Sequence, residues 1–183
     1  GFADEAGDGI DTQIKATQAL GWQCIEARNI NGINMTDISD REFESVCAKL
    51  ESAGIRINCF GSAVANWGKD PLRKEDFHAS MAELERAIPR MKILGTHMIR
   101  GMSFKMIKDR PPDDPEIEQV VIKQMRRLVR LCEDAGLLYV HENCMTYGGQ
   151  SHEHTLKLID AVGSEAFRLV FDTGNPVFTD LRM

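Results

Sequence analysis

The chain has 183 residues, of which 43% are hydrophobic, and its 22 basic and 28 acidic residues give a net charge of −6. That size suits one hydrophobic core, and the negative charge argues against nucleic acid as the main ligand. No run approaches the roughly 20 apolar residues that a membrane span needs, and no secretory leader is visible. The cysteines are odd in number and form no CxxC pair, which predicts a cytoplasmic protein with unlinked thiols: Cys24, Cys47, Cys59, Cys132 and Cys144.

The first part of the chain alternates between amphipathic helices and short apolar runs. Residues 10–22 (IDTQIKATQALGW) predict a helix that stops at a glycine, and residues 24–29 (CIEARN) predict the strand that follows. The next helix is predicted over residues 39–54 and the next strand over residues 55–62. Residues 1–4 (GFAD) are interpreted as the remnant of a preceding first strand.

The second part repeats the alternation. A long helix is expected at residues 74–95, and Pro89 should kink it or split it in two. A helix from about Glu116 to Asp134 follows an extended loop, and Ser151 is a candidate N-cap for the last one. Three more strands are predicted, at residues 97–104, 137–144 and 168–176.

This alternation predicts an α/β fold with parallel strands, either a doubly wound sheet or a (β/α)8 TIM barrel. The first βα turn lacks GxGxxG, and polar residues follow many strands instead of gathering at one switch point, which favours the barrel. A barrel of this kind needs about 250 residues. We therefore expect residues 1–183 to form a single TIM-barrel domain of about six strands. It would lack the last two βα units, beyond Met183, and the start of its first strand.

Two carboxylates follow neighbouring predicted strands. In LLYVHENC the side chains of Val140 and Glu142 share one face, and in RLVFD those of Val170 and Asp172 do. Adjacent strands lie about 4.8 Å apart, so we expect the two acids side by side at the barrel mouth. A bound divalent cation would make that closeness tolerable. The alternative reading is a salt-bridged Glu142 and a turn residue at Asp172.

At this point the sequence resembles a known family. VHEN and VFDTGNP at the strand ends, the opening GFADEAGDGIDTQIKATQALGWQCIEARN, and CFGSAVANWGK are similar to the xylose isomerase-like TIM barrels. The resemblance implies one divalent metal ion (Mn²⁺, Mg²⁺ or Co²⁺, with Zn²⁺ also compatible) held by a glutamate, an aspartate, a histidine and a second glutamate. Glu142 and Asp172 match the first two, and the other two ligands would lie beyond Met183.

The resemblance also implies the chemistry, which is proton transfer next to the carbonyl of a small sugar or polyol through an enediolate. Glu142 would serve as metal ligand and general base of this isomerase or epimerase. An inosose-type dehydratase on the same scaffold is the main alternative. An apurinic-site endonuclease is disfavoured because the third and fourth strands end without histidines. A non-catalytic sugar-binding barrel is the remaining option, and no nucleic-acid or membrane partner is expected. Homo-oligomerisation is left open.

Four further residues are candidates for substrate binding. Asn175 follows Asp172 by three positions, Trp67 lies in the loop after the third strand, Glu26 ends the inner face of the second strand, and Arg100 lies on the fourth. Each has a structural alternative: a turn residue for Asn175, loop packing for Trp67, and ion pairs for Glu26 and Arg100.

Three histidines are expected to be structural. The pair formed by His152 and His154 should lie solvated in the first turn of a helix, and His141 should point away from the pore as a buried imidazole.

Overall fold

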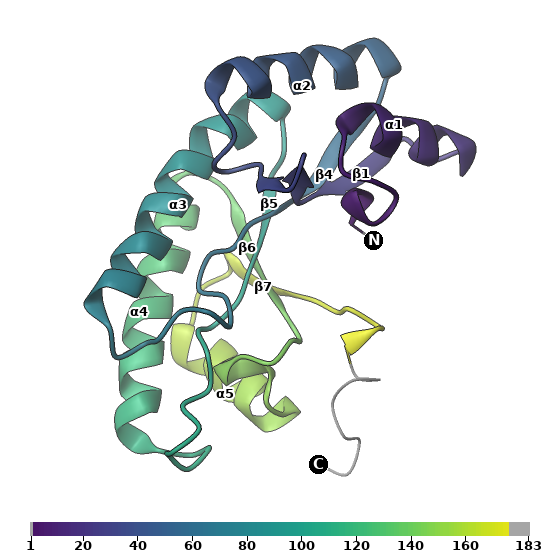
Figure 1. Ribbon diagram of the computed structural model, residues 1–183. Coiled ribbons are helices and arrows are strands. Elements are labelled where there is room, and N and C mark those ends of the chain that lie inside the picture. The colour runs from purple at the N-terminus through teal and green to yellow at the C-terminus, as the bar shows by residue number, and fades with distance from the viewer. Residues whose placement is uncertain (1, 176–183) are drawn as a thin grey trace. The chain divides into compact units, whose positions relative to one another are not determined.

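The computed structural model describes residues 2–175 (Figure 1). They fall into two compact units: residues up to 62 together with 83–99, and residues 63–82 together with those from 100 onward. The strands of the main sheet follow one another in the same order as in the chain: β1 (Cys24–Ala27), β4 (Arg56–Gly61), β5 (Met98–Gly101), β6 (Leu138–Glu142) and β7 (Phe167–Val170). A doubly wound sheet would reverse its strand order at a switch point. Sequential order is the topology of a barrel, as predicted.

Within residues 2–175 the main sheet has five strands, where about six were expected. The predicted first strand is reduced to an isolated parallel bridge between Phe2 and Glu26, because the chain turns into the short 3-10 helix η1 (Ala3–Glu5) directly afterwards. The hairpin of β2 (Asn29–Ile30) and β3 (Ile33–Asn34) was not predicted.

Helices α1 (Ile10–Ala19) and α2 (Asp40–Ala53) pack against each other in the first unit. The ends of α2 follow from its flanking residues. The Ser39 side chain accepts a hydrogen bond from a first-turn backbone N–H, and Gly54 takes the left-handed conformation with φ 65° that ends the helix. Phe43, Val46 and Leu50 of α2 are buried at helical spacing.

Helix α3 (Lys74–Leu94) runs through Pro89 as one element, so of the two expected outcomes, a kink or a split, the split does not occur. Proline has no backbone N–H, so the helix lacks one backbone hydrogen bond at Pro89. The next residue, Arg90, ties α3 to a distant loop: its guanidinium donates to the carbonyl oxygens of Met35 at 2.6 Å and Ile38 at 2.7 Å. The same group lies over the ring of Phe43, 4.9 Å from its centroid.

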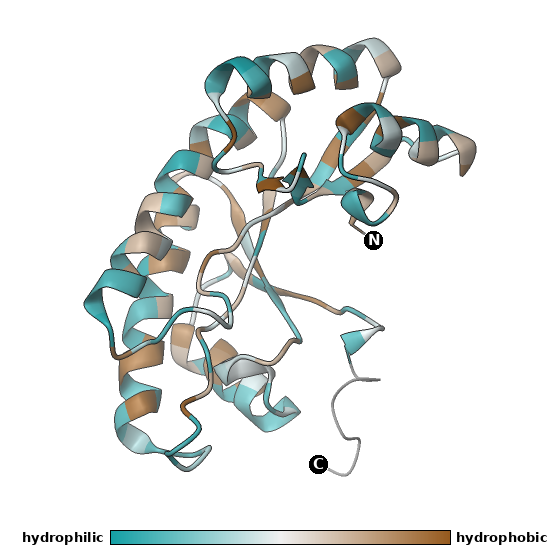
Figure 2. Cartoon of the chain, viewed as in Figure 1, coloured by the Kyte–Doolittle hydropathy of each residue, from teal (hydrophilic) through white to brown (hydrophobic). Residues whose placement is uncertain are grey.

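The second unit contains α4 (Pro115–Asp134), the 3-10 helix η2 (Tyr147–Gly149) and α5 (His152–Val162). Figure 1 shows α4 and α5 next to each other, and α4 also contacts β6. Hydrophobic residues recur along α4 between hydrophilic ones (Figure 2), and those buried are Ile117, Val121, Met125, Leu128, Val129 and Cys132. Among residues 2–175, no helix is long and apolar enough to span a membrane.

Candidate active site

Glu142 ends β6 and is only 7% exposed. Its two oxygens contact two other residues that the sequence had singled out. Arg100 near the end of β5 places Nε 3.2 Å from Oε2, and Asn175 donates from Nδ2 to Oε1 at 3.1 Å. Arg100 is 4% exposed, so its positive charge compensates the carboxylate inside the protein. Three candidates from three segments of the chain therefore meet at one buried carboxylate.

Oxygen Oε2 of Glu142 is buried, yet no hydrogen bond to it is found among the residues that the structure describes. The guanidinium contact is close enough for an ion pair, but its angle does not suit a hydrogen bond. Most buried polar atoms in proteins have such a partner. Oε2 thus keeps lone pairs for a cation or for a proton taken from a ligand.

Asp172 is not directly opposite Glu142 in the strand register. The strand register pairs Glu142 with Val170, so Asp172 lies two residues further along, beyond the end of β7. β7 enters the sheet with Phe167 opposite Tyr139. The expected placement of Glu142 beside Asp172 stays a prediction. The Asp172 side chain accepts a hydrogen bond from the Gly174 backbone at 2.7 Å, as an aspartate at a turn does.

The structure also brings Asn143 into the site, which the sequence analysis had overlooked. Its side chain forms two hydrogen bonds with the main chain of Asp172, donating to the carbonyl oxygen at 3.0 Å and accepting from the N–H at 2.6 Å. The only sequence signal was a carboxamide directly after the last strand residue. Strand alternation places Asn143 on the face opposite Glu142.

A second layer of side chains supports the end of β6 from the other face. His141 is 1% exposed, and its Nε2 lies 2.9 Å from Ser103 Oγ. Ser103 also accepts a hydrogen bond from the Gly148 backbone at 2.7 Å. Burial lowers the pKa of His141 to about 4, which keeps the imidazole neutral at pH 7. The expectation of a buried structural histidine is confirmed.

Cys144 lies two residues after Glu142. Burial, followed by the negative charge of Glu142, raises the pKa of its thiol to about 11. The thiol is therefore protonated at neutral pH, and Cys144 is not a ready nucleophile.

Two other candidates lie in or after the first strands of the sheet. Trp67 is 57% exposed in the loop between β4 and α3. Glu26 is half-buried in β1 and pairs in register with Cys59 of β4. Their roles in substrate binding stay predictions.

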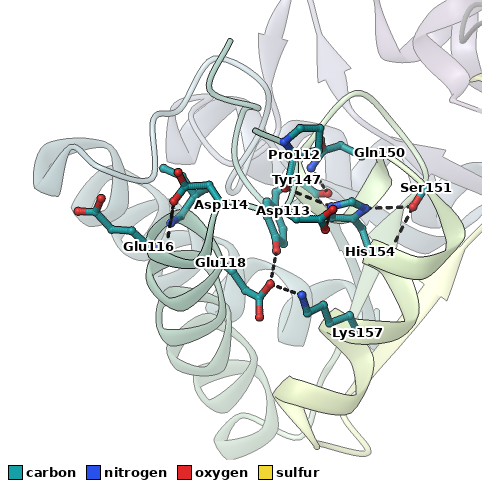
Figure 3. A network of polar contacts seen from close by, with 11 residues as sticks. Pro112, Asp113, Asp114, Glu116, Glu118, Tyr147, Gln150, Ser151, His154 and Lys157 are labelled. Carbon is teal, nitrogen blue, oxygen red and sulfur yellow. Dashed lines mark hydrogen bonds and ion pairs between the residues drawn. The ribbon is translucent and has the colours of Figure 1, made fainter. Parts of the chain in front are cut away.

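His154 corrects a prediction, because it is 9% exposed and not solvated. Its Nδ1 lies 3.0 Å from Ser151 Oγ and its Nε2 lies 3.2 Å from the carbonyl oxygen of Pro112 (Figure 3). The first turn of α5 faces the loop before α4, which the sequence spacing did not show. His152, by contrast, has an 81% exposed side chain, as expected.

Comparison with known proteins identifies the family. A family model described as xylose isomerase-like TIM barrel matches residues 14–181. The chain belongs to this family. A sequence comparison with curated proteins gives no match.

Solved structures of xylose isomerase-like TIM barrels and related proteins share the fold. A xylose isomerase-like TIM barrel protein from Mycobacterium smegmatis in complex with magnesium has a TM-score of 0.71 at 18% identity, over 92% of this chain and 58% of that one. The 3-keto-D-glucoside 4-epimerase of E. coli has a TM-score of 0.73 at 13% identity, over 96% and 67%. The IolI protein with a zinc atom has a TM-score of 0.73 at 14% identity, over 94% and 61%. The chain thus spans about three fifths of the length of two of these proteins and two thirds of the third.

The side chains of this family member are compatible with a divalent metal ion. Glu142 and Asp172 offer carboxylate oxygens, which suit hard and borderline cations, and the buried Glu142 Oε2 accepts no hydrogen bond within residues 2–175. The described part of the chain holds no group of three or more His, Cys, Asp or Glu side chains that could bind a metal by themselves.

Proposed function

We propose that the protein is a metal-dependent isomerase or epimerase of a small sugar or polyol, with Glu142 as the base that removes a proton next to the carbonyl. The observation that carries the proposal is the buried Glu142 carboxylate at the C-terminal end of a barrel strand, where active sites of this fold lie. Membership in the family and the resemblance to a sugar epimerase and to magnesium- and zinc-containing structures support it.

Each of these side chains has its own proposed role. Asn175 holds Glu142 Oε1, so that Oε2 is the oxygen oriented for proton transfer. Arg100 balances the charge of the carboxylate before the proton arrives. Glu142 and Asp172 are the proposed ligands of a divalent ion, which when bound would act as a Lewis acid toward the substrate oxygens. Asn175 and Arg100, with Trp67 in the loop after β4 and Glu26 in β1, are the proposed substrate contacts.

The experiment is a screen of ketoses and inososes with the purified protein and Mn²⁺, Mg²⁺, Co²⁺ or Zn²⁺, with products identified by NMR in D₂O. Deuterium incorporated at the carbon next to the carbonyl reports proton abstraction, and loss of water would indicate a dehydratase. The Glu142→Gln substitution keeps the size of the side chain but removes the base. We expect it to lower kcat by at least about a hundredfold.

The matched control is Glu51→Gln, the same substitution at an exposed position of α2. It should leave turnover unchanged. Turnover and deuterium incorporation by the Glu142→Gln variant at the rate of the unaltered protein would refute the role of Glu142.

A further inference from the structure

The Asn143 side chain forms with the Asp172 backbone the pair of hydrogen bonds that a residue of a neighbouring strand would form. The backbone ladder between β6 and β7 ends with the pair Glu142 and Val170. Beyond it, Asn143 Oδ1 accepts from the Asp172 N–H at 2.6 Å, and Asn143 Nδ2 donates to the Asp172 carbonyl at 3.0 Å. A carboxamide carries the same donor and acceptor pair as a peptide group. The side chain therefore continues the pairing past the point where the two strands stop.

These two hydrogen bonds belong to a closed series of contacts that begins and ends beside Glu142, the proposed base. Asp172 is held by Asn143, and its carboxylate accepts from the Gly174 backbone at 2.7 Å. One residue later, Asn175 donates to Glu142 Oε1 at 3.1 Å, which returns the series to the neighbour of Asn143. Residues 172–175 lie outside β7, so these side-chain contacts take the place of ladder hydrogen bonds.

We propose that Asn143 is a positioning residue of the active site, one that holds residues 172–175 against Glu142. This inference rests on the proposed function for its catalytic meaning, but its structural part stands separately. Asn143 is not proposed to touch substrate or metal. It acts through Asp172, a proposed metal ligand, and through Asn175, which fixes the orientation of the Glu142 carboxylate. Loss of the Asn143 carboxamide should therefore make Asp172 more mobile without unfolding the chain.

The test compares the unaltered chain with the Asn143→Ala variant and with Asn58→Ala, a matched control at an exposed position of β4. Hydrogen–deuterium exchange of the segment 170–175 is measured by mass spectrometry without metal, and Mn²⁺ binding is measured by calorimetry. We expect Asn143→Ala to accelerate exchange of this segment about tenfold and to weaken Mn²⁺ binding about tenfold, because two hydrogen bonds are lost. Asn58→Ala should change neither quantity.

Circular dichroism and thermal melting show whether the Asn143→Ala variant is folded. If it is not, Asn143→Gln replaces it. That side chain keeps both polar groups but is one methylene longer, so it cannot reproduce both distances, and the same changes are expected.

Two results would overturn the inference: exchange of the segment at the original rate, or accelerated exchange together with unchanged Mn²⁺ affinity. If the unaltered chain binds no Mn²⁺, the proposed function is judged by the D₂O screen and not by this measurement. Exchange then decides the positioning role alone: acceleration supports it, and no acceleration overturns it.

Discussion

Gly101 at the end of β5 leaves space for the side chain of Tyr139. A Cβ atom added to Gly101 would lie 2.2 Å from the Tyr139 hydroxyl oxygen and 2.3 Å from Cζ. Tyr139 is 0% exposed, and its hydroxyl donates to the Met102 carbonyl at 2.7 Å. Gly101 is not among the glycines with positive φ, so the requirement for glycine here is one of space and not of backbone strain.

The cost of Gly101→Ala has two parts. Forcing an additional methyl group into a packed interior costs about 1–3 kcal/mol. If Tyr139 moves aside, its hydroxyl leaves the Met102 carbonyl, and an unsatisfied buried group costs about 1–3 kcal/mol more. We therefore expect the free energy of unfolding to fall by about 4 kcal/mol, measured by urea denaturation with circular dichroism.

A double-mutant cycle isolates the clash. The Tyr139→Leu substitution removes the end of the ring, so adding Gly101→Ala in that background should cost less than about 1 kcal/mol, and the two changes should be strongly coupled. The control is Gly9→Ala, where the nearest atom to the new Cβ is Asn31 Oδ1 at 3.6 Å. Equal costs of Gly101→Ala in both backgrounds would show that Tyr139 is not the reason for glycine.

Two further predictions concern thiols and pH. Burial raises the pKa of Cys132 to about 12, so iodoacetamide at pH 8 should label the half-buried Cys24 and Cys47 first and leave Cys132 unlabelled until the protein is denatured, as read by mass spectrometry. The hydrogen bond from Arg110 lowers the pKa of Asp114, the N-cap of α4. Stability from this carboxylate is present above its ordinary pKa of 3.8 and is lost as pH falls through the lowered native value. Asp114→Asn should thus be less stable than the unaltered chain at pH 7, and the difference should shrink below pH 3.8; an equal difference at both pH values would contradict this assignment.

The sequence predicted the elements whose ends carry local signals. Ser39 and Gly54 mark the limits of α2, and Ser151 caps α5, because a hydroxyl acceptor or a left-handed glycine suits a helix end wherever the rest of the chain lies. The hairpin of β2 and β3 was missed because two-residue strands are too short to show an alternating pattern.

The sequence singled out Glu142, Arg100 and Asn175 but did not predict the contacts between them. Glu142 was placed correctly at a strand end by alternation alone. The offset of Asp172 was not predictable, because register depends on which residues of two distant strands meet. The role of Asn143 was missed for a related reason: a side chain that pairs with a backbone 29 residues away leaves no periodic trace. His154 was misjudged because its partner Pro112 lies 42 residues earlier in the chain.

The hydrogen bonds from Arg90 to the carbonyl oxygens of Met35 and Ile38 have a consequence for the chain while it is being synthesised. Arg90 lies 55 residues after Met35 and 52 residues after Ile38. Residues 63–82, which belong to the other unit, are synthesised in between. The loop near Met35 therefore leaves the ribosome well before the arginine that will fasten it. A stalled chain that ends before Arg90 should therefore be cut by a protease at this loop sooner than one that extends beyond Arg90.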